Sequence, residues 1–128
     1  MIRLLLVAAG GAIGSAARFG LGAAVQRWRP ESGWPWGTLC ANVLGGLLMG
    51  ALVGWLALRG GADQERLRLL LGVGVLGGFT TFSAFTLETV LMIEQRRLPA
   101  ASAYIALSVA LSVAALVAGL WLARRAFA

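Results

Sequence analysis

Long uncharged segments alternate with short charged segments along the whole chain. Residues 34–58, 69–87 and 98–123 contain no charged residue, and each run approaches or exceeds the roughly 20 residues that a helix needs to cross the apolar core of a bilayer. A fourth run, over residues 4–17, is shorter, but the apolar sequence resumes after the single charge of Arg18. The pattern predicts an all-α membrane protein. We expect four transmembrane helices over about residues 2–26, 36–58, 67–94 and 99–123, within one domain that covers residues 1–128.

The composition also places the chain in the membrane class. Hydrophobic residues make up 59% and charged residues 12% of the 128 residues, and the mean hydropathy is +0.84, whereas soluble domains are about 45–50% apolar and about 25% charged. The net charge of +6 comes from arginine alone, and the arginines lie at helix ends without the basic cluster of a nucleic-acid-binding surface. With no histidine, no carboxylate pair and one cysteine, the sequence shows no enzymatic site.

The arginines are divided almost evenly between the two sides of the membrane. Four crossings place six arginines on the side of the N-terminus and five on the other side. Because the arginine and lysine bias sets orientation, so small a difference predicts insertion in both directions. Two copies inserted in opposite directions could form an antiparallel dimer. A transport function would need such a dimer, since four short helices hardly enclose a pore alone.

Residues 77–89 interrupt the third predicted helix with a polar composition unlike that of their surroundings. They include a pair of glycines, five hydroxyl side chains and Glu88. Lipid offers these groups no hydrogen-bond partner, so they must face protein or water. A break of the helix between Gly77 and Thr80 would also release main-chain carbonyls, which suit a hard cation such as sodium. An ordinary helix kink is the alternative interpretation.

Three phenylalanines, Phe79, Phe82 and Phe85, follow one another at a spacing of three and would share one helical face. They either pack in the core or present the positive edges of their rings to an anion. Glu88 is the one carboxylate well inside a predicted membrane helix. It either lies near the membrane boundary or accepts hydrogen bonds from Thr89 or from another polar helix.

Polar residues of the first two helices have two interpretations each. Thr38 and Asn42 are four residues apart, so they share a face of the second helix. Asn42 serves either as a hydrogen bond between helices or as a donor to a permeating solute. Arg18 either extends to the membrane boundary or lies in a water-filled vestibule that attracts anions.

The fourth helix carries a line of hydroxyl groups. Tyr104, Ser108 and Ser112 recur every four residues. Each step drifts by only about 40° around the helix, so the three side chains form one slowly winding polar line. One hydroxyl alone could bond back to its own helix, but three in register indicate a hydrophilic track.

Together these residues resemble the Fluc/CrcB family of bacterial fluoride channels. The likeness covers nearly the whole chain, and the stretch from Gly77 to Ser83, followed by Phe85 and Glu88, is its most specific part. Ala84 departs from the pattern, since similar proteins often carry a hydroxyl residue there. The other matching residues are Gly10, Gly11, Ala12, Ile13, Gly14 and Arg18 in the first helix, and Gly37, Thr38, Leu39, Asn42, Gly45 and Gly46 in the second.

The resemblance implies a dual-topology homodimer of antiparallel subunits in the bacterial inner membrane, with two pores that passively export fluoride from the cytoplasm. Phe82 and Phe85 would contact fluoride through their ring edges, and Arg18 would serve the aqueous vestibule. Main-chain carbonyls of Gly77 and Thr80 from both subunits would hold a central structural sodium ion. Asn42, Tyr104, Ser108, Ser112, Thr38 and Glu88 would line or neighbour the pore.

A small proton-coupled multidrug exporter is the main alternative, because such proteins are also short, four-helical and often dual in topology. That class needs a carboxylate in its first helix, where this chain has Arg18 and no acid. Glu88 would have to carry the proton instead. A membrane subunit whose polar residues merely join helices is a third hypothesis, and the polar line on the fourth helix argues against it.

Overall fold

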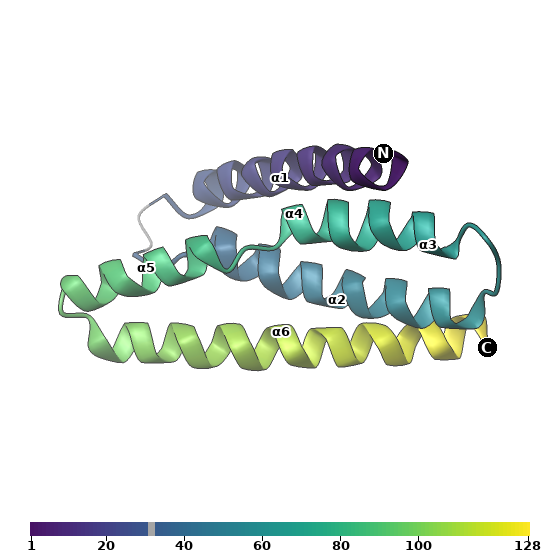
Figure 1. Ribbon diagram of the computed structural model, residues 1–128. Coiled ribbons are helices and arrows are strands. Elements are labelled where there is room, and N and C mark those ends of the chain that lie inside the picture. Colours follow the sequence, from purple (N-terminus) through teal and green to yellow (C-terminus); the bar gives the residue numbers. More distant parts are fainter. Residues whose placement is uncertain (31–32) are drawn as a thin grey trace.

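The computed structural model describes residues 1–30 and 33–128, and these residues form helices joined by short turns (Figure 1). Within these described ranges, four segments are long and apolar enough to cross a membrane: Ile2–Trp28, Trp36–Leu58, Gln64–Glu94 and Leu98–Phe127. The predicted all-α membrane fold with four spans is therefore confirmed. The elements in chain order are α1 (Ile2–Trp28), α2 (Trp36–Leu58), α3 (Gln64–Leu67), η1 (Arg68–Leu76), α4 (Gly77–Phe79), α5 (Ser83–Glu94) and α6 (Leu98–Phe127).

The predicted boundaries agree with the structure at α2, where both ends match. The third span begins earlier than predicted, because Gln64–Leu67 adds one polar turn ahead of the apolar run. The last helix continues beyond its predicted end to Phe127. Arg124 and Arg125 lie in its last turn, where positive charge interacts favourably with the helix dipole.

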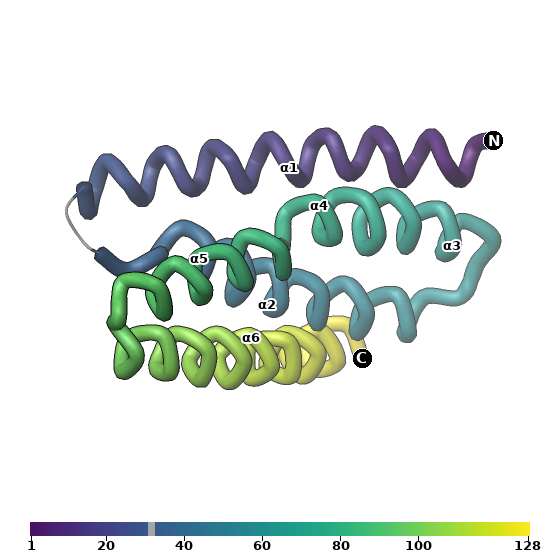
Figure 2. The backbone as a smooth tube through the Cα atoms, turned by 60° about the vertical axis from the view of Figure 1, so that its left-hand side comes forward, coloured from purple at the N-terminus to yellow at the C-terminus, as the bar shows by residue number. Residues whose placement is uncertain are grey.

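Glycines set how closely the helices approach one another. α2 and α6 run side by side in the same direction, and a Cβ atom at Gly50 of α2 would overlap the carbonyl oxygen of Leu116. α1 approaches the third span in the same manner, since Gly10 and Gly14 meet the main chain of η1 (Figure 2). In a membrane, close van der Waals packing of this kind replaces the hydrophobic attraction that operates between helices in water.

The third span is broken after α4. The backbone at Thr80 is extended, with φ −79° and ψ 157°, and helical structure resumes at Ser83. The break is therefore confirmed, but it lies after the glycine pair: Gly77 is still helical, with φ −63° and ψ −38°. Gly78 serves packing instead, because a Cβ atom there would lie 2.6 Å from the carbonyl oxygen of Gly11 on α1.

The turns ahead of the break are wider than those of an α-helix. η1 is a π-helix, in which a main-chain amide donates to the carbonyl five residues earlier, as that of Gly77 does to Gly72. Such helices are rare and occur mostly as single turns near functional sites. The uniform apolar run from Leu69 to Leu76 supports an α-helix equally well, so hydropathy could not predict this change.

The break changes which helix the third span packs against. Before it, η1 and α4 lie along α1, whereas after it α5 lies along α6 (Figure 1). The second half of α1 is therefore left without the third span beside it. This displacement positions the two cavities described below.

Gly50→Ala should lower the midpoint of thermal unfolding in detergent, because the added methyl group meets the backbone of α6, which cannot move without separating the helices. Overpacking of this kind costs about 1–3 kcal/mol. The matched control is Gly20→Ala on α1, where a Cβ atom meets no neighbouring atom within 4 Å. Equal midpoints for the two variants would contradict the packing described for α2 and α6.

Candidate functional site

Neighbouring helices satisfy main-chain groups that the break releases. The Oδ1 atom of Asn42 on α2 accepts the Thr81 amide at 2.8 Å, and its Nδ2 atom donates to the Thr81 carbonyl at 3.0 Å. Arg18 on α1 donates from Nε to the Gly78 carbonyl at 3.3 Å. Asn42 thus forms the predicted hydrogen bond between helices, while its role toward a solute stays a prediction.

The two threonines of the break complete this network. Thr80 donates from Oγ1 to the Leu76 carbonyl at 3.0 Å, and the Thr81 Oγ1 atom accepts the Ala84 amide at 3.1 Å, which caps the start of α5. In contrast, the carbonyl oxygens of Gly77 and Thr80 accept no hydrogen bond from the described part of the chain. These two oxygens can therefore serve an outside ligand.

Glu88 on α5 accepts two short hydrogen bonds from two other helices. Thr38 on α2 donates to its Oε1 atom at 2.7 Å, and the hydroxyl of Tyr104 on α6 donates to its Oε2 atom at 2.6 Å. Thr89, one of the expected partners, donates instead to the Phe85 carbonyl of its own helix. The expectation of a partner on another polar helix is thus confirmed, and the Thr89 alternative is wrong.

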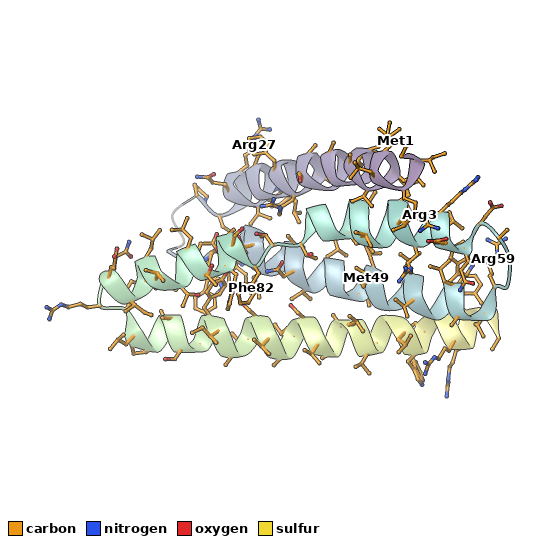
Figure 3. The ribbon with its side chains drawn as sticks, in the orientation of Figure 1. Met1, Arg3, Arg27, Met49, Arg59 and Phe82 are labelled. Atoms are coloured by element: carbon orange, nitrogen blue, oxygen red, sulfur yellow. The ribbon has the colours of Figure 1, made fainter. Side chains whose placement is uncertain are left out.

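Phe82 and Phe85 lie together at the start of α5, with ring centroids 5.6 Å apart. Phe85 is buried and its ring centroid lies 5.2 Å from that of Tyr104, whereas Phe82 is 76% exposed (Figure 3). Phe79 does not extend their face as expected, because the break separates it from α5. It packs instead beside Gly45 on α2. Of the three phenylalanines expected on one face, only Phe82 and Phe85 lie together.

A cavity of about 360 Å³, the inner cavity, lies beside the break. Ser108 and Ser112 of α6 line it, and the Oγ atoms of both are buried without a hydrogen-bond partner among the described residues. Because a buried hydroxyl without a partner is unfavourable, the pair indicates a ligand or water in this cavity. The lining residues are Asn42, Thr80, Thr81, Phe82, Phe85, Ser108, Val109, Ser112 and Val113.

A larger cavity of about 650 Å³, the outer cavity, opens between the second half of α1 and the start of α2. Arg18 and Arg29 line it, together with Thr38 and Glu88. It occupies the space that the third span leaves beside α1 after the break. Among the described residues that line it, the two guanidinium groups outnumber the single carboxylate, so this lining attracts anions. Arg18 therefore faces a cavity rather than extending along lipid.

The hydrogen-bonded group of Thr38, Glu88 and Tyr104 lies between the two cavities. Thr38 and Glu88 line the outer cavity, and Tyr104 packs against Phe85, which lines the inner one. Trp34 also lines the outer cavity and meets the ring of Tyr104 edge-on, at a centroid distance of 5.6 Å. Its sequence context indicates only a membrane-interface tryptophan, so this contact could not be predicted.

The fold and these cavities define a small multi-pass membrane protein with a cavity on either side of the Thr38, Glu88 and Tyr104 group. The family model described as "CrcB-like protein, Camphor Resistance (CrcB)" matches residues 5–120. The chain belongs to this family. The resemblance that rests on the stretch around Gly77 and on Phe85 is therefore confirmed.

Close relatives carry the name "Fluoride-specific ion channel FluC". One from Phenylobacterium zucineum (strain HLK1) is 64% identical over the full length of both chains. One from Caulobacter sp. (strain K31) is 62% identical over 99% of this chain and 98% of its own, and one from Caulobacter vibrioides (strain NA1000 / CB15N) is 57% identical over both full lengths. The names describe ion channels, so the protein is not an enzyme, and it is a multi-pass bacterial membrane protein.

Thr38→Val should lower the free energy of unfolding in detergent, because it removes the donor to Oε1 of Glu88 and leaves that partly buried oxygen without this hydrogen bond. The loss of a buried hydrogen bond costs about 1–3 kcal/mol. Ser102→Ala is the control, since Ser102 is exposed on α6 and its hydroxyl has no hydrogen-bond partner in the described part of the chain. If the two variants lose the same stability, Thr38 does not support Glu88.

Proposed function

We propose that this protein is a passive fluoride channel that works as an antiparallel homodimer with two pores. The observation that carries the proposal is the pair of buried hydroxyls, Ser108 and Ser112, without a partner in the described chain, in a cavity shared with Phe82 and Phe85. The names of its relatives supply the identity of the ion.

The chemistry of the inner cavity suits a small, strongly hydrated anion. Fluoride must exchange its water for hydrogen-bond donors, and the cavity offers hydroxyl and amide groups together with two phenylalanine rings, whose edges are positive. The described residues that line it include no charged side chain. An ion can therefore bind without being trapped by a fixed cation, and conduction requires sites that bind weakly enough to release.

The ion path would begin in the outer cavity, where Arg18 and Arg29 raise the local concentration of anions. It would then pass Glu88 on its way to the inner cavity. Thr38 and Tyr104 donate to the two carboxyl oxygens of Glu88. Because these two donors partly offset the negative charge of the carboxylate, Glu88 would repel a passing anion less. These three residues would neighbour the pore.

A second copy would complete the inner cavity. Phe82, which lines the inner cavity, is 76% exposed on one chain, and its neighbours Ser83 and Thr86 are exposed with it. A partner subunit that covers this face would enclose the ion path, and two-fold symmetry would repeat it, which gives two pores. The nearly even distribution of arginine supports insertion in opposite directions.

A central sodium ion would fit the oxygen atoms left available at the break. Hard cations prefer oxygen ligands, and the carbonyls of Gly77 and Thr80 lack donors within the described chain. No group of three or more histidine, cysteine or acidic residues could hold a metal ion in the described ranges, so main-chain oxygens are the candidate ligands. Corresponding carbonyls from a partner would complete the set, and the ion would join the two subunits.

The test is fluoride efflux from liposomes that contain the purified protein, with a potassium ionophore to dissipate the membrane voltage. We expect efflux without a proton gradient. Absence of fluoride movement would overturn the proposal, and strict dependence on a proton gradient would favour the proton-coupled exporter, with Glu88 as its carrier.

In the same assay, Phe82→Ile should lower fluoride efflux about tenfold, the effect of losing roughly 1.4 kcal/mol of interaction between the ion and the ring edge. The matched control is Phe127→Ile, because Phe127 is also exposed but lies at the end of α6, away from both cavities. Equal efflux from the two variants would show that Phe82 only packs.

Replacement of sodium by N-methylglucamine at constant ionic strength should dissociate the dimer, because the unpaired carbonyls of Gly77 and Thr80 would then face each other across the subunit contact. Chemical cross-linking in detergent measures the dimer fraction before and after exchange. A dimer fraction that is indifferent to sodium would exclude the central ion without touching the fluoride assignment.

A further inference from the structure

We infer that Asn42 is a positioning residue that acts on the proposed ion path by holding the break, through Thr81. This inference refines the expected role of Asn42 as a donor to the permeating ion. The geometry that carries it is independent of which ion the protein transports. It concerns the main chain at the point where α4 ends and α5 has not yet begun.

The break leaves Thr81 without main-chain partners on both of its sides. In a continuous helix its amide would donate to the carbonyl of Gly77 and its carbonyl would accept the amide of Phe85. Neither bond forms in the structure, since the backbone at Thr80 is extended and the first amide of the new helical ladder is that of Thr86, bonded to Phe82. Thr81 is nevertheless buried, with 9% exposure.

Asn42 replaces both missing bonds with one side chain. Its amide oxygen and nitrogen lie 2.8 Å and 3.0 Å from the nitrogen and oxygen of Thr81, so the side chain pairs with this residue as a neighbouring strand would. These two bonds use one N–H of the Asn42 side-chain amide and its side-chain carbonyl oxygen. Only asparagine combines a donor and an acceptor at this reach, because serine is too short and aspartate lacks the donor.

The position of Thr81 in turn sets the start of α5. Its hydroxyl caps the Ala84 amide, and α5 then carries Phe85 and Glu88. α2 therefore contacts the third span at two points: Asn42 bonds to Thr81 just before α5 and, one turn earlier on the same face of α2, Thr38 bonds to Glu88 of α5. Without the first contact, the turn that places Phe82 and Phe85 beside the inner cavity loses its anchor.

The experiment is hydrogen–deuterium exchange by mass spectrometry on the full-length protein in lipid nanodiscs, with fluoride efflux measured on the same preparations. In Asn42→Ala, the amide of Thr81 should exchange at least about tenfold faster than in the original protein, because a local opening no longer breaks a hydrogen bond. In Asn42→Gln, which keeps an uncharged donor and acceptor at a longer reach, the increase should be smaller, and efflux should fall in the order of the exchange rates.

The matched control is Ser108→Ala, which removes a donor from the same inner cavity but whose side chain makes no hydrogen bond to the described residues of the break. It should lower efflux and leave exchange at Thr81 unchanged. The inference is overturned if Asn42 variants lose efflux with unchanged exchange at Thr81, which would make Asn42 a direct ion donor. It is equally overturned if exchange rises evenly in all spans, or if efflux does not change. Should Asn42→Ala fail to fold, the uncharged Asn42→Gln variant alone decides among these outcomes.

Failure of the proposed function is separately visible in this experiment. If the original protein moves no fluoride, the function is wrong, while the exchange rates at Thr81 still report whether Asn42 holds the break.

Discussion

The structure depends on one constraint: a helix that breaks inside an apolar environment must find partners for the main-chain groups it releases. Lipid supplies none, and each unsatisfied group is costly. Arg18 from α1 and Asn42 from α2 reach the two sides of the break, and Thr81 caps the helix that follows. The polar side chains of Arg18 and Asn42 within apolar helices are thus explained by the hydrogen bonds that they make to the main chain of the third span.

The same break separates the tasks of the third span. Before it, the carbonyl of Gly77 accepts no hydrogen bond from the described residues and suits the proposed cation. After it, the third span no longer lies along α1: α5 packs against α6, and this places Phe85 and Glu88 beside the line of hydroxyls on α6. The space vacated beside α1 becomes the outer cavity, so the attraction of anions and their proposed coordination occur in consecutive places. A straight helix would provide neither.

Hydropathy and spacing predicted the four spans, the broken third helix and the shared face of Thr38 and Asn42, because these features depend on residues close in sequence. Residues 77–83 also identified the family. The pattern could not assign roles that depend on packing. Gly78 was associated with the break, whereas it permits the close approach of α1, and the expected face of three phenylalanines is divided because helical spacing does not continue across Thr80. The partners of Glu88 likewise depend on the register of α2 and α6, which a single sequence does not contain.

The central claim, that fluoride crosses passively along this path, is tested most directly by the reversal potential of the protein in a planar bilayer with unequal fluoride on the two sides. The account predicts a shift of about 59 mV for each tenfold fluoride ratio, the value for a single charge moving alone. It also predicts no shift when a pH gradient is added. A reversal potential that follows the pH gradient, or that ignores the fluoride ratio, would contradict the account.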